Sequence, residues 1–236
     1  MRMNVSGEWP GEITIRSTWS KATGRRWNSD MPYGHVRLIR GSSAFTRAAA
    51  QHVLGYGVEL VTSPPLLKGP DASWERAGFE PFLELHLYRR SLVGDLPDLS
   101  PKITEISPDF EALQTIDRSA FNALWRMDAV GLRESFNATT RSVVLMSSNS
   151  DEMAGYAIVG LSGITGYLQR IAVDPAHQRQ GHGQRLVRAS LRWAGEHGAA
   201  TMLLNTQPEN TISADLYRSE GFARMPGGLR VLKYES

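Results

Sequence analysis

The chain has no cysteine among its 236 residues. This absence excludes disulfides, zinc–sulfur sites and a thiolate nucleophile. No apolar run reaches the roughly 18–20 residues of a membrane-spanning helix, and the first residues show no apolar signal-peptide core. We therefore expect a cytoplasmic protein that does not associate with membranes.

An excess of one charge is also missing. Lysine and arginine total 26 and aspartate and glutamate total 24, so the formal net charge is only +2. No dense basic block stands out, and nucleic acid is not an expected partner. Hydrophobic residues at 41% and charged residues at 21% are typical of a globular protein. The length allows one large domain or two small ones.

A change of composition near the middle of the chain suggests a linker. The stretch Val93–Lys102 carries two prolines and two aspartates, which favour turns over regular structure. We therefore predict two domains, residues 1–95 and 101–236.

The C-terminal part alternates between strand-like and helix-like patterns. Ser107-Pro108-Asp109 has the features of a helix start: a cap, a proline in the first turn and an acid near the positive end of the helix dipole. Apolar residues then recur at helical spacing to Leu124. We expect further helices at 132–139, 184–197 and 208–219, strands at 103–106, 141–146, 155–161, 167–173 and 201–206, a turn at 147–151 and a final pair of strands.

A glycine-containing loop, Gln178–Gly183, lies between the strand-like Tyr167–Val173 and the helix expected from Gln184. Glycines let the backbone approach a ligand closely, and the free N–H groups at a helix N-terminus point at an anion. The order strand, glycine loop, helix therefore predicts a phosphate-binding site.

The loop also fits the pattern Q/R-x-x-G-x-G/A, and a second pattern follows at Asn210, Ala214, Leu216-Tyr217 and Gly221-Phe222. On these two motifs residues 101–236 resemble the GNAT superfamily of acetyl-CoA-dependent N-acetyltransferases. The resemblance implies an α/β (α+β) fold with a mixed central sheet flanked by helices. It implies acetyl-CoA as co-substrate, no metal, and transfer of acetyl to a primary amine of a small molecule, peptide or protein by direct attack in a ternary complex.

The resemblance also implies roles for particular residues. Tyr217 would be the general acid that protonates the departing CoA thiolate. Asn210 would bind the pantetheine arm or cap the helix that carries Tyr217, and both roles stay open. The cofactor-binding residues would be Ile171, Ala172 and Val173 through their main chain, and Gln178, Arg179, Gln180, Gly181, His182, Gly183, Gln184 and Asn210.

A general base is not evident. The positions where the family often has glutamate hold Tyr167, Gln169 and Asn205, none of them a good base at neutral pH. The amine could lose its proton to bulk water or to one of four carboxylates, Asp128, Glu134, Glu152 and Asp174. Each of the four is expected first of all to be a surface group. A non-catalytic acyl-CoA-binding or sensing module is the alternative function, and a longer acyl donor stays open.

Other charged or titratable residues near the loop are expected to be exposed to solvent. His177 and His182 flank it, and neutral surface histidines are the commoner case. Arg185, Arg188 and Arg192 follow one helical face and are expected to be solvated, with contact to the adenosine 3′-phosphate as a less favoured role, chiefly for Arg185.

The N-terminal part contains a faint repeat of the C-terminal one. Trp74-Glu75-Arg76-Ala77-Gly78-Phe79 parallels Tyr217–Phe222, and the distance from Pro65 to Trp74 equals that from Pro208 to Tyr217. Residues 31–92 contain no glycine loop, and Trp74 and Leu67 replace the tyrosine and the asparagine. We infer a smaller, degenerate GNAT-like half without a cofactor site.

Overall fold

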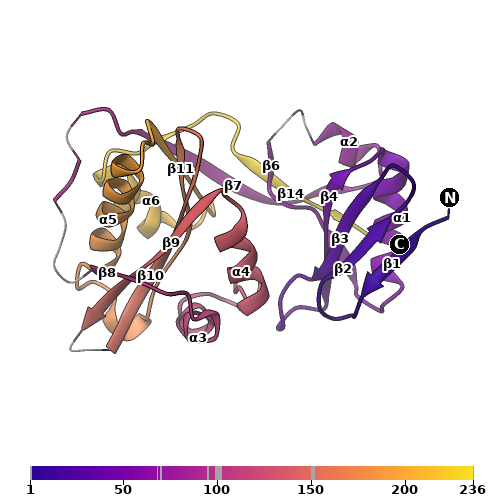
Figure 1. The fold of residues 1–236 in the computed structure, drawn as a ribbon, viewed down its shortest axis with the longest axis horizontal. Helices are drawn as coiled ribbons and strands as arrows, with labels where there is room; N and C mark the ends of the chain where they lie inside the picture. The colour runs from indigo at the N-terminus through magenta and orange to yellow at the C-terminus, as the bar shows by residue number, and fades with distance from the viewer. Residues whose placement is uncertain are drawn as a thin grey trace. The chain divides into compact units, whose positions relative to one another are not determined.

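A computed structural model describes residues 2–67, 69, 71–94, 96–98, 103–149 and 152–235. The chain divides into two compact units, one of residues 1–85 with 227–236 and one of residues 86–226. Each unit is a sheet with helices packed against it (Figure 1). No helix among the described residues has the length and the apolar character needed to cross a bilayer.

In the first unit, an antiparallel meander leads into a helix and a strand that returns parallel to the last one. Phe45, Ala49 and Val53 on the helix are fully buried, and they pack on Ile13 and Val36 of the meander. The elements are β1 (Asn4–Gly7), β2 (Ile13–Arg16), β3 (Lys21–Arg26), β4 (Tyr33–Arg40), α1 (Ser43–Leu54), β5 (Leu60–Thr62), β6 (Leu66–Leu67) and α2 (Ala72–Glu75).

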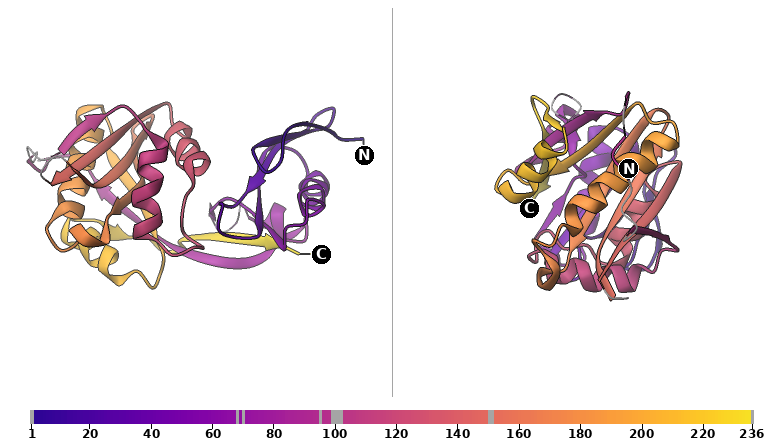
Figure 2. Two further views of the ribbon diagram at one scale, coloured as in Figure 1. Left: turned by 90° about the horizontal axis from the view of Figure 1, so that it is seen from below. Right: turned by 90° about the vertical axis from the view of Figure 1, so that its left-hand side faces the viewer.

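The last strand of the chain belongs to this first unit. β14 (Leu229–Tyr234) pairs with β5 on one side and with the first half of β7 (Glu80–Ser91) on the other, and Leu232 is fully buried there. Figure 2 shows the yellow C-terminal strand beside the purple strand β7. The predicted domain of residues 101–236 therefore included ten residues, 227–236, that the structure places in the other unit. The predicted boundaries 95 and 101 lie outside the described residues, as do residues 99, 100 and 102 of the linker.

The second unit has the mixed, helix-flanked sheet that the sequence predicted. Its strand order is β7-β12-β11-β10-β9-β8, and β11 and β12 are parallel while the other pairs are antiparallel. The elements are β8 (Ile103–Ile106), α3 (Phe110–Ala120), α4 (Ala129–Asn137), β9 (Arg141–Asn149), β10 (Glu152–Ser162), β11 (Thr165–Val173), the 3₁₀ turn η1 (Pro175–His177), α5 (His182–Glu196), β12 (Thr201–Thr206), α6 (Thr211–Ser219) and β13 (Ala223–Arg224).

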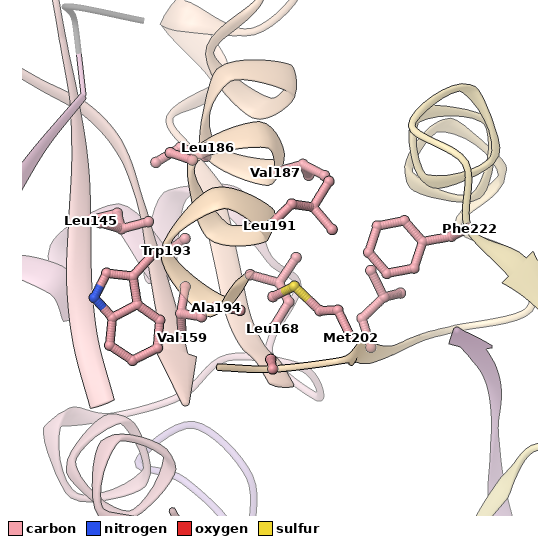
Figure 3. Packing of buried hydrophobic residues seen from close by; sticks show 14 of the residues in the cluster. Leu145, Val159, Leu168, Leu186, Val187, Leu191, Trp193, Ala194, Met202 and Phe222 are labelled. Carbon is pink, nitrogen blue, oxygen red and sulfur yellow. The ribbon is translucent and has the colours of Figure 1, made fainter. Parts of the chain in front are cut away.

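Both faces of this sheet are covered because apolar side chains point alternately to its two sides. Val143 and Leu145 join the cluster under α5, whereas Val144 between them joins the cluster under α3 and α4. Figure 3 shows Leu186, Leu191 and other α5 side chains directed at the strands. Figures 1 and 2 show α5 on one face and α3 with α4 on the other.

Some element boundaries differ from the sequence prediction. The cap of α3 is Asp109, whose carboxylate accepts from the Ala112 N–H at 3.1 Å, so Ser107 does not start the helix. α3 ends at Ala120, not at Leu124. The turn predicted from Ser147 begins later, because β9 continues through Asn149, and residues 150 and 151 lie outside the described part.

The internal repeat has matching geometry in the two units. β4 and β5 are parallel around α1, as β11 and β12 are around α5. The Phe79 N–H donates to the Trp74 carbonyl at 3.1 Å, and the Phe222 N–H donates to the Tyr217 carbonyl at 3.0 Å. Gly78 and Gly221 both have positive φ, at 95° and 79°. The repeat therefore reproduces the same local fold twice.

Replacing Leu232 by alanine should destabilise the first unit. The side chain is fully buried, so its removal leaves a cavity that costs about 2–5 kcal/mol of unfolding free energy. Urea unfolding followed by circular dichroism measures the loss. Ile39→Ala is the control: its side chain is 48% exposed, and the change should stay near 0.5 kcal/mol. Equal effects of the two substitutions would contradict the placement of β14.

Candidate active site

The site is built where two parallel strands separate. β11 and β12 pair from Thr165–Thr201 to Leu168–Leu204, and no pairing continues beyond. β12 goes on to Thr206 beside β7. Among the described residues, the side of β11 that faced β12 therefore has no strand partner from Gln169 to Val173. Such an edge presents main-chain N–H and C=O groups to a ligand.

A bulge explains the separation. On the other side of β11, Val159 pairs with Leu168 and Ile158 with Arg170, so Gln169 is an extra residue. A bulge bends its strand and increases the local twist. The Gln169 side chain lies over Gly160, where its amide nitrogen donates to Thr139 at 3.1 Å. Its Oε1 is buried and has no hydrogen-bond partner among the described residues.

The predicted phosphate loop follows β11 directly. Gly181 is the N-cap residue of α5, with φ at 81°, and Arg179 also has a positive φ of 59°. No side chain caps this helix. The first N–H groups of a helix have no intrahelical partner, and they carry the positive end of the helix dipole. Residues 178–181 are exposed, so these groups are open to an anion.

The equivalent helix of the first unit, α1, has a side-chain cap at its N-terminus. Only Gly41 and Ser42 separate β4 from α1, and the Ser42 hydroxyl accepts from the Phe45 N–H at 3.3 Å. A side chain thus occupies the place that an anion would take. This difference agrees with the sequence interpretation that the first half has no cofactor site.

Two side chains of the loop donate hydrogen bonds to main-chain carbonyls that precede α5. The Gln178 amide donates to the Val173 carbonyl at 3.2 Å, and the Gln180 amide donates to the Ala176 carbonyl at 3.3 Å. A methyl group on Gly183 would lie 3.4 Å from Leu216 of α6. The glycine keeps the space between the two helices open.

Tyr217 lies on α6 and is only 4% exposed, with its ring 6.1 Å from that of Tyr88 and 6.0 Å from that of Phe222. Burial raises the pKa of Tyr217 to about 12, while a hydrogen bond with the Ser213 side chain and the positive charge of Arg170 oppose the rise. The phenol is therefore protonated at neutral pH and can donate a proton.

A buried carboxylate joins the loop helix to the helix of Tyr217. Glu220, 6% exposed, accepts from the Gln184 amide at 2.7 Å and from Arg188 Nε at 3.0 Å. Its carbonyl accepts from Arg90 of β7 at 2.5 Å. α5, α6 and β7 are thereby fixed relative to one another.

Asn210 is the N-cap residue of α6, and its side-chain oxygen accepts from the Ser213 N–H at 3.1 Å. One of its two predicted roles is thus confirmed. Its amide nitrogen lies 3.5 Å from Gln207 Oε1, and contact with a pantetheine arm stays a prediction.

One histidine predicted to lie at the surface is buried, and the three arginines of α5 make hydrogen bonds or ion pairs. His182 is 3% exposed, and its Nδ1 lies 2.8 Å from the Ser147 hydroxyl, so it is not a surface histidine. Arg188 pairs with Glu220, and Arg192 pairs with Glu196 at 2.8 Å. Arg185 donates to the Gln180 carbonyl at 3.1 Å.

The four carboxylates named as possible general bases cap helices, lie exposed or have other interactions. Asp128 caps α4, where it accepts from the Gly131 N–H at 2.9 Å. Asp174 caps η1 and also accepts from the Ser119 hydroxyl at 3.0 Å. Glu152 is exposed at the start of β10, and Glu134 lies on α4 with a further interaction. Asn205 is exposed on β12.

One polar cluster near the site was missed in the sequence. Asp117 of α3 is fully buried and binds Arg170 of β11 and the Tyr156 hydroxyl of β10. The available signals were weak: a carboxylate four residues after Leu113 on the apolar face of a helix, and an arginine within an apolar strand. Neither signal names its partner, because the two residues are 53 positions apart.

Comparison with known proteins agrees with this geometry. Residues 110–222 match the model of the acetyltransferase (GNAT) family. Over 119 residues the chain is 29% identical to ribosomal protein bS18-alanine N-acetyltransferase of Haemophilus ducreyi, which covers 50% of this chain and 79% of that protein. It is 36% identical over 56 residues to aminoglycoside N(6′)-acetyltransferase type 1 of Salmonella typhimurium, covering 24% of this chain and 39% of the relative.

Among solved structures, a tandem GNAT protein from the clavulanic acid biosynthesis pathway has a TM-score of 0.63 at 14% identity, covering 95% of this chain and 82% of its own. That likeness concerns the fold, and it extends over both units. The match to the acetyltransferase (GNAT) family lies in residues 110–222, which belong to the second unit.

The raised pKa of Tyr217 predicts a pH dependence of stability. A tyrosine has an ordinary pKa of about 10 in an unfolded chain, below its value of about 12 in the fold. Its stabilising contribution is fully present below pH 10 and is lost as the pH rises through the folded value. In urea unfolding, the wild-type free energy should therefore fall more steeply above pH 10 than that of Tyr217→Phe. Parallel curves would contradict the shift.

Proposed function

We propose that the protein is an N-acetyltransferase that takes acetyl from acetyl-CoA and transfers it to a primary amine. The observation that carries the proposal is the open N-terminus of α5 beside the unpaired edge of β11, with Tyr217 on the adjacent helix. The family match supports the same reaction class.

Acetyl-CoA fits the polar groups of the site. Its pyrophosphate would bind the N–H groups of residues 179–184, where the helix dipole is positive. Its pantetheine amides would pair with the main chain of Ile171, Ala172 and Val173, as an added strand does. Arg185 Nε is buried without a partner among the described residues, which suits a nearby anion.

The chain's own residues would then bring about direct transfer. The amine nitrogen forms a bond to the thioester carbonyl carbon, and the carbon–sulfur bond breaks. Tyr217 gives its proton to the departing thiolate and recovers one from solvent. The amine releases its proton to solvent, because the candidate carboxylates cap helices, lie exposed or have other partners.

The acceptor is a primary amine of a peptide or protein, or of a small molecule. One relative is named for alanine of a ribosomal protein and another for an aminoglycoside. A panel of a peptide beginning with alanine, a lysine-containing peptide and an aminoglycoside covers these classes. Release of free CoA can be followed with a thiol reagent, because the protein has no cysteine to react.

The second candidate is a non-catalytic module that binds acyl-CoA. The observation in its favour is that the candidate bases cap helices, lie exposed or have other partners. It predicts acetyl-CoA binding with no amine-dependent release of CoA, and the panel distinguishes it directly.

Calorimetric titration with acetyl-CoA tests the cofactor site, with Gly183→Val as the informative variant. Gly183 does not have a positive φ, so valine should leave the fold intact while filling the space before Leu216. We expect a loss of affinity of more than about tenfold.

Glu196→Val is the matched control, because it places the same side chain at the far end of α5. It should bind as the wild type does. Unchanged affinity in Gly183→Val, measured on folded protein, would remove acetyl-CoA from this loop.

Tyr217→Phe tests the general acid. The phenylalanine keeps the packing against Tyr88 and Phe222 and removes only the proton donor. We expect kcat to fall by about 10²–10⁴-fold, with little change in KM for acetyl-CoA. Steady-state kinetics with the best amine of the panel gives both constants. A variant that turns over at the wild-type rate would show that the thiolate leaves without an acid.

A further inference from the structure

A buried carboxylate and an arginine connect β11 to the segment between α3 and α4. Asp117, at the end of α3, accepts four hydrogen bonds: from Arg170 Nε at 2.6 Å, Arg170 Nη2 at 2.7 Å, the Tyr156 hydroxyl at 2.7 Å and the Met127 N–H at 2.7 Å. Its side chain has no exposed surface.

Arg170 also reaches the segment directly. Its Nη2 donates to the Trp125 carbonyl at 2.8 Å, and its guanidinium lies 3.7 Å from the centre of the Phe121 ring. Phe121, Trp125 and Met127 all belong to the connection 121–128, which contains no helix or strand. Arg170 and Asp117 therefore hold this connection at three points.

The chemistry of the Arg170–Asp117 pair favours a role in positioning the connection 121–128 over a contribution to stability alone. A buried ion pair loses the hydration of both charges, and apolar replacements are often as stable. Here every contact is directional: the planar fork of arginine matches the carboxylate, one N–H reaches a carbonyl, and the flat face covers a ring. Together these contacts fix one arrangement of the connection.

The position of Arg170 relates that arrangement to the proposed transfer reaction. It follows the bulged residue Gln169 and belongs to the free edge of β11 where the thioester would bind. Tyr217 packs in the cluster under α5, on one face of the sheet, whereas Tyr156 packs in the cluster under α3 and α4, on the other. Because α5 and Tyr217 occupy the first face, the second face, with α3, α4 and the connection 121–128, is the one left for an acceptor amine.

We propose that Arg170 is a positioning residue. Together with Asp117 it holds the connection 121–128 in a fixed position relative to β11, and so places the acceptor amine against the thioester. The proposal rests on the proposed transfer reaction. It assigns the pair to acceptor use and not to acetyl-CoA binding, which involves the loop and the main chain of β11.

Arg170→Lys tests the role in the full-length protein. Lysine keeps the positive charge beside Asp117 but cannot make the forked contact, the Trp125 bond and the ring contact together. We expect kcat/KM for an alanine-initiated peptide, or for whichever panel amine the wild type acetylates, to fall by about 10–100-fold. The Kd for acetyl-CoA should stay within about threefold of the wild-type value. Hydrogen exchange should rise in 121–128 and stay unchanged in α5.

Tyr156→Phe is the matched control. It removes one hydrogen bond from the same carboxylate but leaves the contacts to Trp125, Met127 and Phe121 in place. Its kcat/KM and its exchange in 121–128 should follow the wild type.

Three results overturn the inference: equal losses in the two variants, an acetyl-CoA Kd that weakens as much as kcat/KM falls, or unchanged exchange in 121–128 of Arg170→Lys. A wild type that binds acetyl-CoA but acetylates no amine of the panel refutes the proposed function itself. That outcome is seen before either variant is examined.

Discussion

The extra residue in β11 is the constraint on which the site depends. Because Gln169 has no partner in β10, β11 bends there, and its pairing with β12 ends at the preceding residue. Three features follow from that insertion: the free edge of β11, the direction of the loop after it and the direction of the Arg170 side chain. A regular strand in this place would have continued to pair with β12 and left no main-chain groups for a ligand.

The two units differ in how the N-terminus of the equivalent helix is capped. Both have a parallel strand pair around a helix, and both have the same turn after an aromatic residue. In one, Ser42 caps its own helix, whereas in the other a glycine precedes the helix and no side chain caps it. A glycine cap costs only about a few tenths of a kcal/mol relative to a serine cap, but it leaves the start of the helix without a side-chain cap.

Local patterns in the sequence were sufficient for the loop, for the helix that carries Tyr217 and for the repeat, since each depends on residues within about one turn or strand. The cap of α3 was misplaced because serine and aspartate two positions apart are both good caps. The buried cluster of Asp117 and the engaged His182 could not be found, because their partners are distant in sequence. The same reason hid the sheet position of β14: a final strand was predicted, but its pairing with β5 joins residues more than 160 positions apart.

The insertion of β14 between β5 and β7 also bears on how the chain folds during synthesis. Domains generally form in the order in which they leave the ribosome. Here the unit that begins first has a gap in its sheet until residues 229–234 emerge, while the unit of residues 86–226 already has all its strands. The second unit can thus be complete before the first, and the edges of β5 and β7 that β14 covers stay unpaired in the nascent chain until residues 229–234 are translated.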